Sequence, residues 1–324
     1  GVIAIILALN NFGVYSLVFM TISHDFINTL LLWIYSSWRP YLKFSFNSLK
    51  SMFSFGSKLF IVSLSNSFFN NIYNIIIGKL YTSEILGFYS KGYSFSRIPV
   101  NLILNTANQV FFPVFSKLQN DKVELKNTLQ IVSKNLMMVT FPAMIGFIMI
   151  SEELVIILLT EKWIQIVPYL QLLSISAIFH PLIGTNITAI NSLGRSDLYL
   201  KVDIFNKILI IIIIYFTYKY GIFGLIYGHI LSVIISHFLY SYFINILLNY
   251  SIFQQIEDLS SMFLVSTTMG ICVYSIEYLN ISNLYIDIIV KLLIGLFTYT
   301  FFLNLLRIKE FLDFKNMIIS KFNF

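Results

Sequence analysis

The sequence is poor in charge and in cysteine. Only 11% of its 324 residues are Asp, Glu, Lys or Arg, whereas soluble domains hold about 25%. The single cysteine, Cys272, cannot form a disulfide within the chain, and four scattered histidines beside it are too few for a zinc site. No Walker sequence (GxxxxGKS/T) and no GxGxxG occurs, so we expect no bound nucleotide, metal or other cofactor.

The sequence is rich in apolar residues. They make up 57% of the sequence, and the mean hydropathy is +0.81. One water-soluble core cannot hold so many apolar side chains, so the chain must have lipid as its solvent. This excludes a soluble enzyme, a nucleic-acid-binding domain and a disordered protein. The net charge of +6 comes mostly from cations in short segments between apolar runs, which is typical of membrane proteins.

Long apolar runs fill the sequence. A transmembrane helix needs about 20 apolar residues, so the runs predict an all-α, polytopic membrane bundle of about ten helices. The predicted spans are 1–9, 14–35, 56–78, 85–112, 136–150, 164–191, 202–218, 222–248, 261–279 and 284–306. Pro99, Pro142 and Pro181 lie within spans, where proline kinks a helix. Because residue 1 is Gly inside an apolar run, we expect that an N-terminal part of the protein is missing.

The cations between the spans predict the orientation. If segment 37–58 is cytoplasmic, the segments on that side hold 14 Lys and Arg and those on the other side hold three. This positive-inside pattern places the C-terminus in the cytoplasm. Segment 249–260 fits less well, because it carries Glu257 and Asp258 but no cation. All loops are short, so no separate soluble catalytic domain is expected.

Two neighbouring spans carry a polar stripe along one side. At 100° per residue, the stripe of span 56–78 covers about 100° and that of span 85–112 about 120°. The stripes consist of Ser63, Asn66, Ser67, Asn70 and Asn74, and of Lys91, Ser94, Arg97, Asn101, Asn105 and Asn108. Asn and Ser can bridge tightly packed membrane helices. Two consecutive full-length stripes, one with two cations, favour a water-filled cavity instead.

Arg97 is the most informative member of these stripes. A mid-helix Arg costs at least about 2.5–3.5 kcal/mol on insertion scales, and its guanidinium does not lose its charge. Its planar fork suits phosphate or diphosphate, so the pattern predicts an anionic ligand. The alternative is a structural Arg that snorkels or forms a salt bridge. Lys91 lies nearer the outer end and can snorkel to the interface.

Four charged residues inside spans are candidates for ion coupling. Asp203 and Lys207 are spaced i,i+4 and are expected to pair, either structurally or as part of a transport mechanism. His24 and Asp25 are adjacent in the middle of a span, where they could relay protons or bind a cation.

Other polar residues are expected to have structural roles. His180, His229 and His237 have no acidic neighbour in sequence and are predicted to be structural, with their hydrogen bonds satisfied. Glu277 and Asp287 lie near an outer boundary and are expected to be solvated.

Short motifs recur in a set order over residues 50–230. They are Phe55-Gly56, Ile77-Gly78, Leu86 to Lys91, Phe112 to Lys117, Phe141-Pro142 with Gly146, Trp163 with Pro168, Leu193 to Asp197 and Gly221 to Gly224. In this order the chain resembles the polysaccharide-transporter family of Wzx-type flippases, within the multidrug/oligosaccharidyl-lipid/polysaccharide (MOP) superfamily.

The resemblance implies a MATE-like fold of two six-helix lobes. Residues 1–36 would end the N-terminal lobe, 37–55 form a cytoplasmic amphipathic linker, 56–248 form the C-terminal lobe, 261–306 add two helices and 307–324 form a basic tail. It also implies transport, and not catalysis, of undecaprenyl-diphosphate-linked oligosaccharides across the bacterial inner membrane by rocking of the lobes. The products would be O-antigen, capsule or exopolysaccharide. A polysaccharide polymerase or export complex is a candidate partner.

Three other functions remain open. A drug/cation antiporter of the same superfamily would prefer acidic residues in its cavity, whereas the deepest charge here is Arg97. A polysaccharide polymerase or acyltransferase needs an acid/base or nucleophilic set, and the outer loop 151–163 has three Glu but no His. A scaffold subunit of an export complex would have no cavity of its own.

Overall fold

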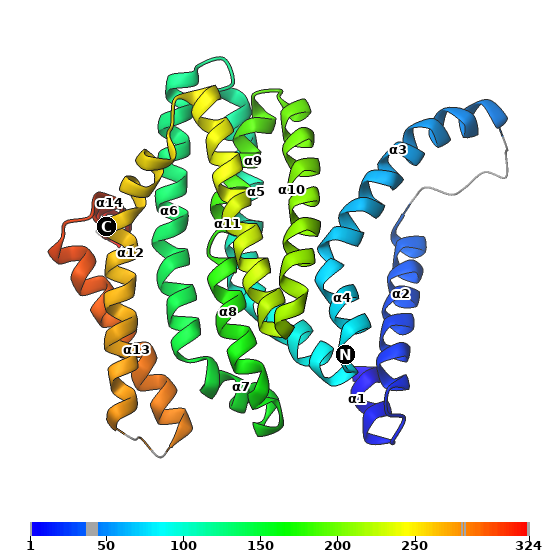
Figure 1. Cartoon of the computed structure of the whole chain (residues 1–324), viewed down its shortest axis with the longest axis horizontal. Helices are drawn as coiled ribbons and strands as arrows, with labels where there is room; N and C mark the ends of the chain where they lie inside the picture. The colour runs from blue at the N-terminus through cyan, green and yellow to red at the C-terminus, as the bar shows by residue number, and fades with distance from the viewer. Residues whose placement is uncertain (1, 37–44, 280, 282, 323–324) are drawn as a thin grey trace. The chain divides into compact units, whose positions relative to one another are not determined.

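A computed structural model shows the chain as a set of helices (Figure 1). It describes residues 2–36, 45–279, 281 and 283–322. The side chains of 47–52, 54–56, 58–59, 62, 105–109, 317–319 and 321–322 lie outside this description. The chain divides into two compact units, Gly1–Ser65 and Asn66–Phe324. The predicted division into lobes, linker and extra helices remains a prediction, and residues 37–44 of the predicted linker lie outside the described residues.

Helices occupy nearly all of the described chain, and no strand occurs in that part. The helices are α1 (Val2–Leu9), α2 (Tyr15–Tyr35), α3 (Phe46–Asn70), α4 (Ile72–Leu80), α5 (Ser83–Lys117), α6 (Lys122–Met149), α7 (Ser151–Leu159), α8 (Val167–Ala177), α9 (His180–Ser192), α10 (Ser196–Thr217), α11 (Gly221–Leu248), α12 (Ile252–Ser275), α13 (Leu284–Leu305) and α14 (Lys309–Phe322). Short 3-10 turns occupy Glu161–Ile166, Tyr218–Tyr220 and Ile276–Leu279. The predicted all-α class is confirmed.

Six segments of the described chain are long and apolar enough to cross a membrane. They are Tyr15–Tyr35, Lys122–Met149, Glu161–Ser192, Ser196–Leu248, Ile252–Leu279 and Leu284–Leu305. Ser196–Leu248 contains two helices, α10 and α11. The predicted spans 56–78 and 85–112 are not among the six, because the polar stripes lower the hydropathy of α3 and α5. The chain is a multi-pass membrane bundle in which two helices are more polar than the rest.

Two predicted spans are each broken into two helices. Span 56–78 is interrupted at Asn71, whose side-chain amide donates to the carbonyl of Ser67 over 3.0 Å. Such local side-chain bonds compete with helix propagation. Span 164–191 is interrupted between α8 and α9, where Pro181 occupies the first turn of α9. Proline is tolerated there because the first N–H groups of a helix have no intrahelical partner.

Side-chain caps start several helices earlier than the apolar runs predict. Asp121 accepts hydrogen bonds from the N–H groups of Val123 and Glu124, so α6 begins well before the predicted span 136–150. Ser251 and Gln254 form a reciprocal capping box at the start of α12. Each cap satisfies N–H groups that the helix itself leaves free.

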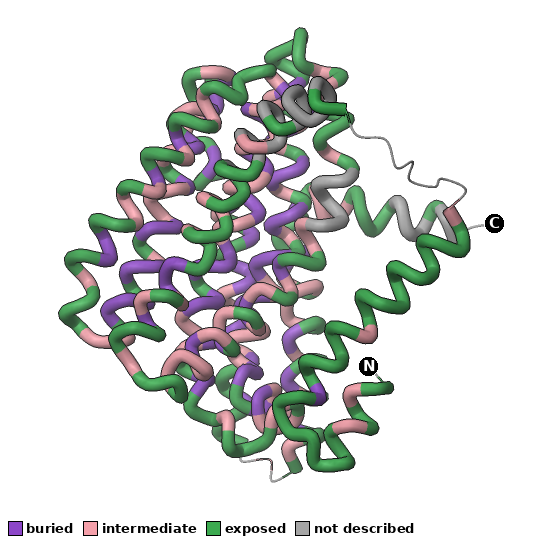
Figure 2. Tube along the Cα trace, turned by 90° about the vertical axis from the view of Figure 1, so that its right-hand side faces the viewer, coloured by how far each residue is buried: buried purple, intermediate pink, exposed green. Residues whose placement is uncertain are grey.

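The interior of the second unit is apolar, and so is much of its outer surface. The largest buried cluster lies among α5, α6, α9, α10 and α11, and a second joins α6 to α12 and α13. Figure 2 shows the buried trace in the interior of the bundle and exposed residues along its outer helices. Large apolar side chains such as Phe216, Leu296 and Phe297 stand exposed there. A surface of this kind suits hydrocarbon and not water.

Two glycines bring α11 very close to the end of α10. A Cβ atom on Gly224 would lie 2.6 Å from the carbonyl oxygen of Thr217, and one on Gly228 would lie 2.7 Å from the hydroxyl of Thr217. Larger residues at these positions would push the two helices apart. Small residues four apart permit this kind of close helix packing in membranes.

Candidate functional site

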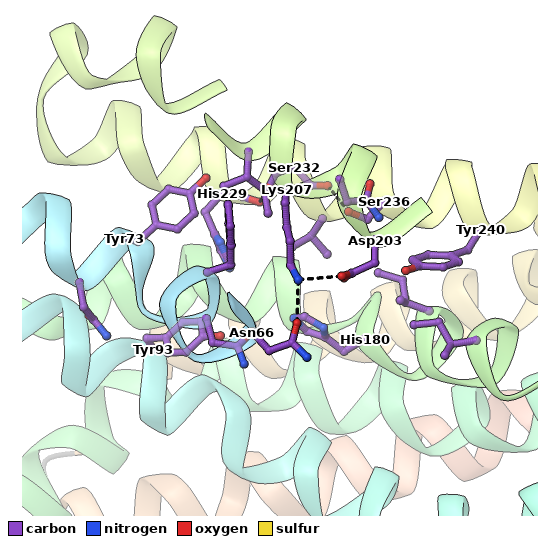
Figure 3. A pocket seen from close by; sticks show the side chains of 18 of the residues that line it. Asn66, Tyr73, Tyr93, His180, Asp203, Lys207, His229, Ser232, Ser236 and Tyr240 are labelled. Carbon is purple, nitrogen blue, oxygen red and sulfur yellow. Dashed lines mark hydrogen bonds and ion pairs between the residues drawn. The ribbon is translucent and has the colours of Figure 1, made fainter. Parts of the chain in front are cut away.

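A polar cavity of about 280 Å³ lies among the helices of the second unit (Figure 3). Its wall is built from the end of α3 and from α4, α5, α9, α10 and α11. The polar side chains that line it are Asn66, Asn70, Asn74, Asn206, Ser232, Ser236, Asp203, Lys207, His180, His229, Tyr73, Tyr89, Tyr93, Tyr199 and Tyr240. Segments far apart in the sequence thus present amides, hydroxyls and charges to one space.

Lys207 occupies the middle of this wall (Figure 3). Its Nζ atom lies 2.7 Å from Oδ2 of Asp203 and donates over 2.7 Å to Oδ1 of Asn66. The ammonium also lies 5.5 Å from the centroid of the Phe69 ring. The pair predicted from the i,i+4 spacing is therefore present. Because the two charges cancel, this part of the wall carries no net charge.

The asparagines of the first stripe have two kinds of environment. Asn66 and Asn70 line the cavity, and Asn66 bonds Lys207. Asn74 also lines it, but its Oδ1 accepts a hydrogen bond of 3.0 Å from Ser90 on α5. The stripe therefore faces a polar space and, at Asn74, also bridges two helices, as the alternative interpretation expects.

His229 packs between two tyrosine rings of this wall. The centroids of the His229 and Tyr73 rings are 4.9 Å apart, with an angle of 82° between the ring planes. For His229 and Tyr93 the distance between centroids is 5.7 Å and the angle is 77°. Both nitrogens of His229, and Nε2 of His180, are buried with no hydrogen-bond partner among the described residues. The prediction that the hydrogen bonds of these histidines are satisfied is therefore wrong for these three nitrogens, whereas their structural role stays a prediction.

Arg97 stands close to the cavity without lining it. His180 and His229 lie within electrostatic range of its guanidinium. Its Nη1 atom is buried and has no hydrogen-bond partner in the part of the chain that the structure describes. No carboxylate of those residues pairs with it, so the salt-bridged alternative receives no support from the structure. The charge of Arg97 adds to a wall that is otherwise neutral.

The other predicted site residues are not brought together here. Lys91 is exposed, with its Nζ atom 5.7 Å from the centroid of the Phe95 ring, and Asn101 is exposed as well. Neither lines the cavity. The side chains of Asn105 and Asn108 lie outside the described residues.

His24 and Asp25 belong to the first unit. Nδ1 of His24 lies 3.1 Å from Oδ1 of Asp25, and the two side chains are 77% and 72% exposed.

Sequence reasoning found Asp203 and Lys207 of α10 but missed the other residues that α10 and α11 contribute to the cavity. On α10, Asp203 follows Tyr199 by four residues, and Asn206 and Lys207 follow Asp203 by three and four. On α11, His229, Ser232, Ser236 and Tyr240 likewise follow one another by three or four residues. The helical periodicity that predicts the asparagine stripes of spans 56–78 and 85–112 also places these residues on one face of each helix.

A buried ion triad corrects the expectation for Asp287. Lys291 bonds the Glu153 carboxylate of α7 and lies 2.9 Å from Oδ2 of Asp287. The three side chains are only 5%, 10% and 13% exposed, for Lys291, Glu153 and Asp287 respectively. Asp287 is therefore not solvated. Burial of a charge requires such partners, and the triad ties α13 to the rest of the bundle.

A second ion cluster explains the acidic segment 249–260. Oδ1 of Asp258 lies 2.9 Å from Nζ of Lys134 on α6, and its Oδ2 accepts bonds from Gln130 and Tyr250. Burial, with the Asp258 carboxylate beside it, raises the pKa of Tyr250, so its phenol stays a donor. Lys134 of α6 therefore balances one of the two acidic charges of this segment.

The arrangement around the cavity suits a polar ligand with negative charge. Amides and hydroxyls can bind sugar hydroxyl groups as donors and as acceptors. Asp203 and Lys207 neutralise each other, so Arg97 leaves the region with one positive charge in excess. A cationic ligand would meet that charge unfavourably, whereas phosphate oxygens would be attracted.

Comparison with known proteins gives a consistent set of relatives. A family model described as "Polysaccharide biosynthesis protein" matches residues 1–168. The chain is 32% identical over 161 residues to the teichuronic acid biosynthesis protein TuaB of Bacillus subtilis, a match over 50% of this chain and 33% of that protein. It is 26% identical over 174 residues to the lipopolysaccharide biosynthesis protein WzxC of Escherichia coli, over 54% of this chain and 35% of WzxC.

The succinoglycan biosynthesis transport protein ExoT of Rhizobium meliloti is 24% identical over 176 residues, which are 54% of this chain and 36% of ExoT. The chain thus spans about a third of the length of these curated relatives. Among solved structures it is similar to the lipid II flippase MurJ in an inward closed conformation. The TM-score is 0.74 at 17% identity, over 94% of this chain and 64% of that chain. At this identity the likeness shows the fold.

Proposed function

We propose, from the premise that this chain belongs to the polysaccharide biosynthesis protein family, that it serves in a flippase for lipid-linked oligosaccharides. The substrate we propose is an undecaprenyl-diphosphate-linked repeat unit, carried from the cytoplasmic to the outer leaflet of a bacterial inner membrane. The names of the relatives, which refer to teichuronic acid, lipopolysaccharide and succinoglycan, support a role in O-antigen, capsule or exopolysaccharide synthesis.

The polar cavity carries this proposal. Polar atoms within a membrane bundle cost free energy unless they meet protein, water or a ligand. The cavity volume of about 280 Å³ is close to the lower end of ligand pockets, roughly 300 Å³. It therefore suits part of an oligosaccharide headgroup and not a whole repeat unit.

Different side chains of the cavity region would bind different parts of the substrate. Asn66, Asn70 and Asn74 would bind sugar hydroxyls, and the Lys207–Asp203 pair would add a donor and an acceptor. Arg97 would attract the diphosphate, while the lipid tail stays in the bilayer. The α5 residues Lys91, Asn101, Asn105 and Asn108 would extend the polar track beyond the cavity.

Transport would follow alternating access, in which two lobes rock around the bound headgroup. His24 and Asp25 remain candidates for coupling to an ion. In this proposal the C-terminus is cytoplasmic, as the cation distribution predicts, and a polymerase or export complex receives the product. The role is transport and not catalysis. The excess positive charge near the cavity argues against the drug/cation antiporter.

Complementation tests the transport function. The chain would be expressed in an Escherichia coli strain without WzxC, alone and as a chimera that replaces the matching segment of WzxC. We expect the chimera to restore surface polysaccharide and Lys207→Met to abolish that restoration. Accumulation of lipid-linked repeat units in cells that carry the unmutated chimera would contradict the proposal.

Thiol labelling tests whether the cavity is wet. In a Cys272→Ser background, Asn70→Cys should react with a membrane-impermeant maleimide, because Asn70 lines the cavity. Ile75→Cys, on the exposed apolar side of α4, is the matched control and should stay unlabelled. Protection at both positions would favour helix bridging over a water-filled cavity.

A further inference from the structure

Four buried polar atoms without partners gather near one wall of the cavity. They are Nη1 of Arg97, Nε2 of His180 and both ring nitrogens of His229, and none has a hydrogen-bond partner among the described residues. Buried polar atoms in proteins almost always have one. Three helices, α5, α9 and α11, supply these atoms, so the arrangement depends on the tertiary fold and not on one local turn.

Aromatic packing holds the imidazole of His229, which has no hydrogen-bond partner among the described residues. The His229 ring lies edge-on between Tyr73 and Tyr93, at 4.9 Å and 5.7 Å between ring centroids. His180 begins α9 directly after the break at 178–179, and Pro181 follows it in the first turn. Both rings face the cavity (Figure 3). They therefore present nitrogen atoms that a ligand can bind.

The nearby charges select the sign of that ligand. The titratable and charged groups that line the cavity with His229 are Tyr73 of α4, Tyr89 and Tyr93 of α5, His180 of α9, Tyr199, Asp203 and Lys207 of α10, and Tyr240 of α11, and Arg97 of α5 lies within electrostatic range. Asp203 is the only acid among them, and Lys207 already pairs with it. The charge that is left over is the guanidinium of Arg97. An occupant with negatively charged oxygen atoms would satisfy the imidazole N–H groups and balance this charge.

We propose that His180 and His229, together with the charge of Arg97, form an anion subsite that holds phosphate oxygens of the lipid-linked substrate. This inference rests on the proposed function and adds two residues to it. It assigns phosphate oxygens to the two imidazoles, whereas the side-chain amides of Asn66 and Asn70 would hold sugar.

The histidines also give the subsite a dependence on pH. A neutral imidazole donates one hydrogen bond, whereas a protonated one donates two and carries a charge. A bound anion favours the protonated form. Binding should therefore strengthen as the pH falls from 7.5 to 6.5, and an anion should enter together with a proton.

Calorimetry with inorganic diphosphate tests the subsite in the purified full chain in nanodiscs. The variant His229→Phe keeps the ring packing but removes both nitrogens. His229→Gln keeps an N–H group but cannot take up a proton. His237→Phe is the matched control, because His237 lies two turns away on α11, also has an unpartnered Nδ1, and lines an apolar groove instead of the cavity.

We expect His229→Phe to weaken diphosphate binding tenfold or more and His237→Phe to leave it unchanged. His229→Gln should retain most of the binding at pH 7.5 and lose the extra affinity that the unmutated chain shows at pH 6.5. Diphosphate itself titrates in this range, so the pH response is compared between variants.

Two results would overturn the subsite. One is diphosphate binding by His229→Phe and His180→Phe that equals binding by the unmutated chain, and the other is no binding by any of them. Either result leaves the proposed function standing if the chimera still restores surface polysaccharide. If the chimera fails while His229→Phe binds diphosphate more weakly than the unmutated chain, the subsite stands and the proposed function is wrong.

Discussion

Two groups of charged residues differ in whether each charge has a partner of opposite sign. One group joins α6, α7, α12, α13 and α14, and the other lies around the cavity. Lys291 pairs with two carboxylates, those of Glu153 and Asp287. Lys134 pairs with Asp258, and its Nζ atom also lies 3.6 Å from Oε1 of Glu310. Around the cavity, Lys207 is paired with Asp203, but Arg97 has no carboxylate partner in the described chain. Paired charges of the first group join helices, whereas Arg97 and the histidine nitrogens near it have no such partners among the described residues.

Mutations in the two groups of charges should affect different properties, the stability of the fold in one case and ligand binding in the other. Removing one member of a buried pair leaves a charge without compensation and destabilises the fold. Removing a group that has no partner within the protein leaves the fold nearly unchanged and affects only what binds. Loss of stability and loss of transport should therefore not run in parallel among the variants.

The largest loss of stability is expected for Lys291→Met. It leaves Glu153 and Asp287 buried without a cation, which costs about 3–5 kcal/mol for a buried pair. Thermal unfolding in detergent, followed by loss of the monodisperse peak in size-exclusion chromatography, measures the effect. The triple variant Glu153→Gln, Asp287→Asn, Lys291→Met removes all three charges and should regain most of the loss. A triple variant no more stable than Lys291→Met would show that the charges are not the cause.

A smaller loss is expected for Lys207→Met. Asp203 and Asn66 each lose a partner in a half-buried position, which costs about 1–3 kcal/mol. The double variant Asp203→Asn, Lys207→Met should restore the melting temperature but not polysaccharide export by the chimera. If the double variant exports normally, the pair is structural only, as the alternative interpretation of its spacing holds.

Ser251→Ala should cost about 1 kcal/mol, since it removes the hydroxyl that caps α12. The same thermal assay measures it, and polysaccharide export should be unaffected because Ser251 does not line the cavity. Ser260→Ala is the control, because that exposed hydroxyl only donates to the carbonyl of Glu257 within the same helix. Equal losses for both variants would argue against the cap.

The smallest change in stability is expected for Arg97→Gln, within about 0.5 kcal/mol. Its Nη1 atom has no hydrogen-bond partner to lose among the described residues, so the effect should appear in function. We expect export by the chimera to fall tenfold or more, with Arg97→Lys in between, because Lys keeps the charge but not the planar fork. A large drop in melting temperature with export unchanged would make Arg97 structural.

Local patterns in the sequence predicted the helical class, the polar stripes and the Asp203–Lys207 pair. These features depend on residues three or four apart, which the helix itself places on one face. The early starts of α6 and α12 also depend on local signals, since Asp121 and Ser251 cap them. Apolar runs alone do not show such caps, so the predicted spans began too late.

Contacts between distant segments could not be predicted in the same way. Lys207 and Asn66 are 141 residues apart, and Lys291 and Glu153 are 138 residues apart. The i,i+4 spacing of Asp287 and Lys291 indicates a pair, as it does for Asp203 and Lys207, but no local pattern indicates that Glu153 joins it or that the group is buried. Whether a buried polar atom has a partner depends on the tertiary fold, which is why His180 and His229 were misjudged.

Gly224 and Gly228 have a consequence for how the cavity could open. With no side chains between them and Thr217, α10 and α11 interlock at one end and should move as a single rigid body. Asp203, Lys207 and His229 would then keep their spacing throughout a transport cycle. The short α4 packs against this same end, since Ile72, Tyr73 and Ile77 share a buried cluster with Ile214, Leu225 and Ile226. The part of α3 before the interruption at Asn71 is therefore where we expect the cavity wall to move.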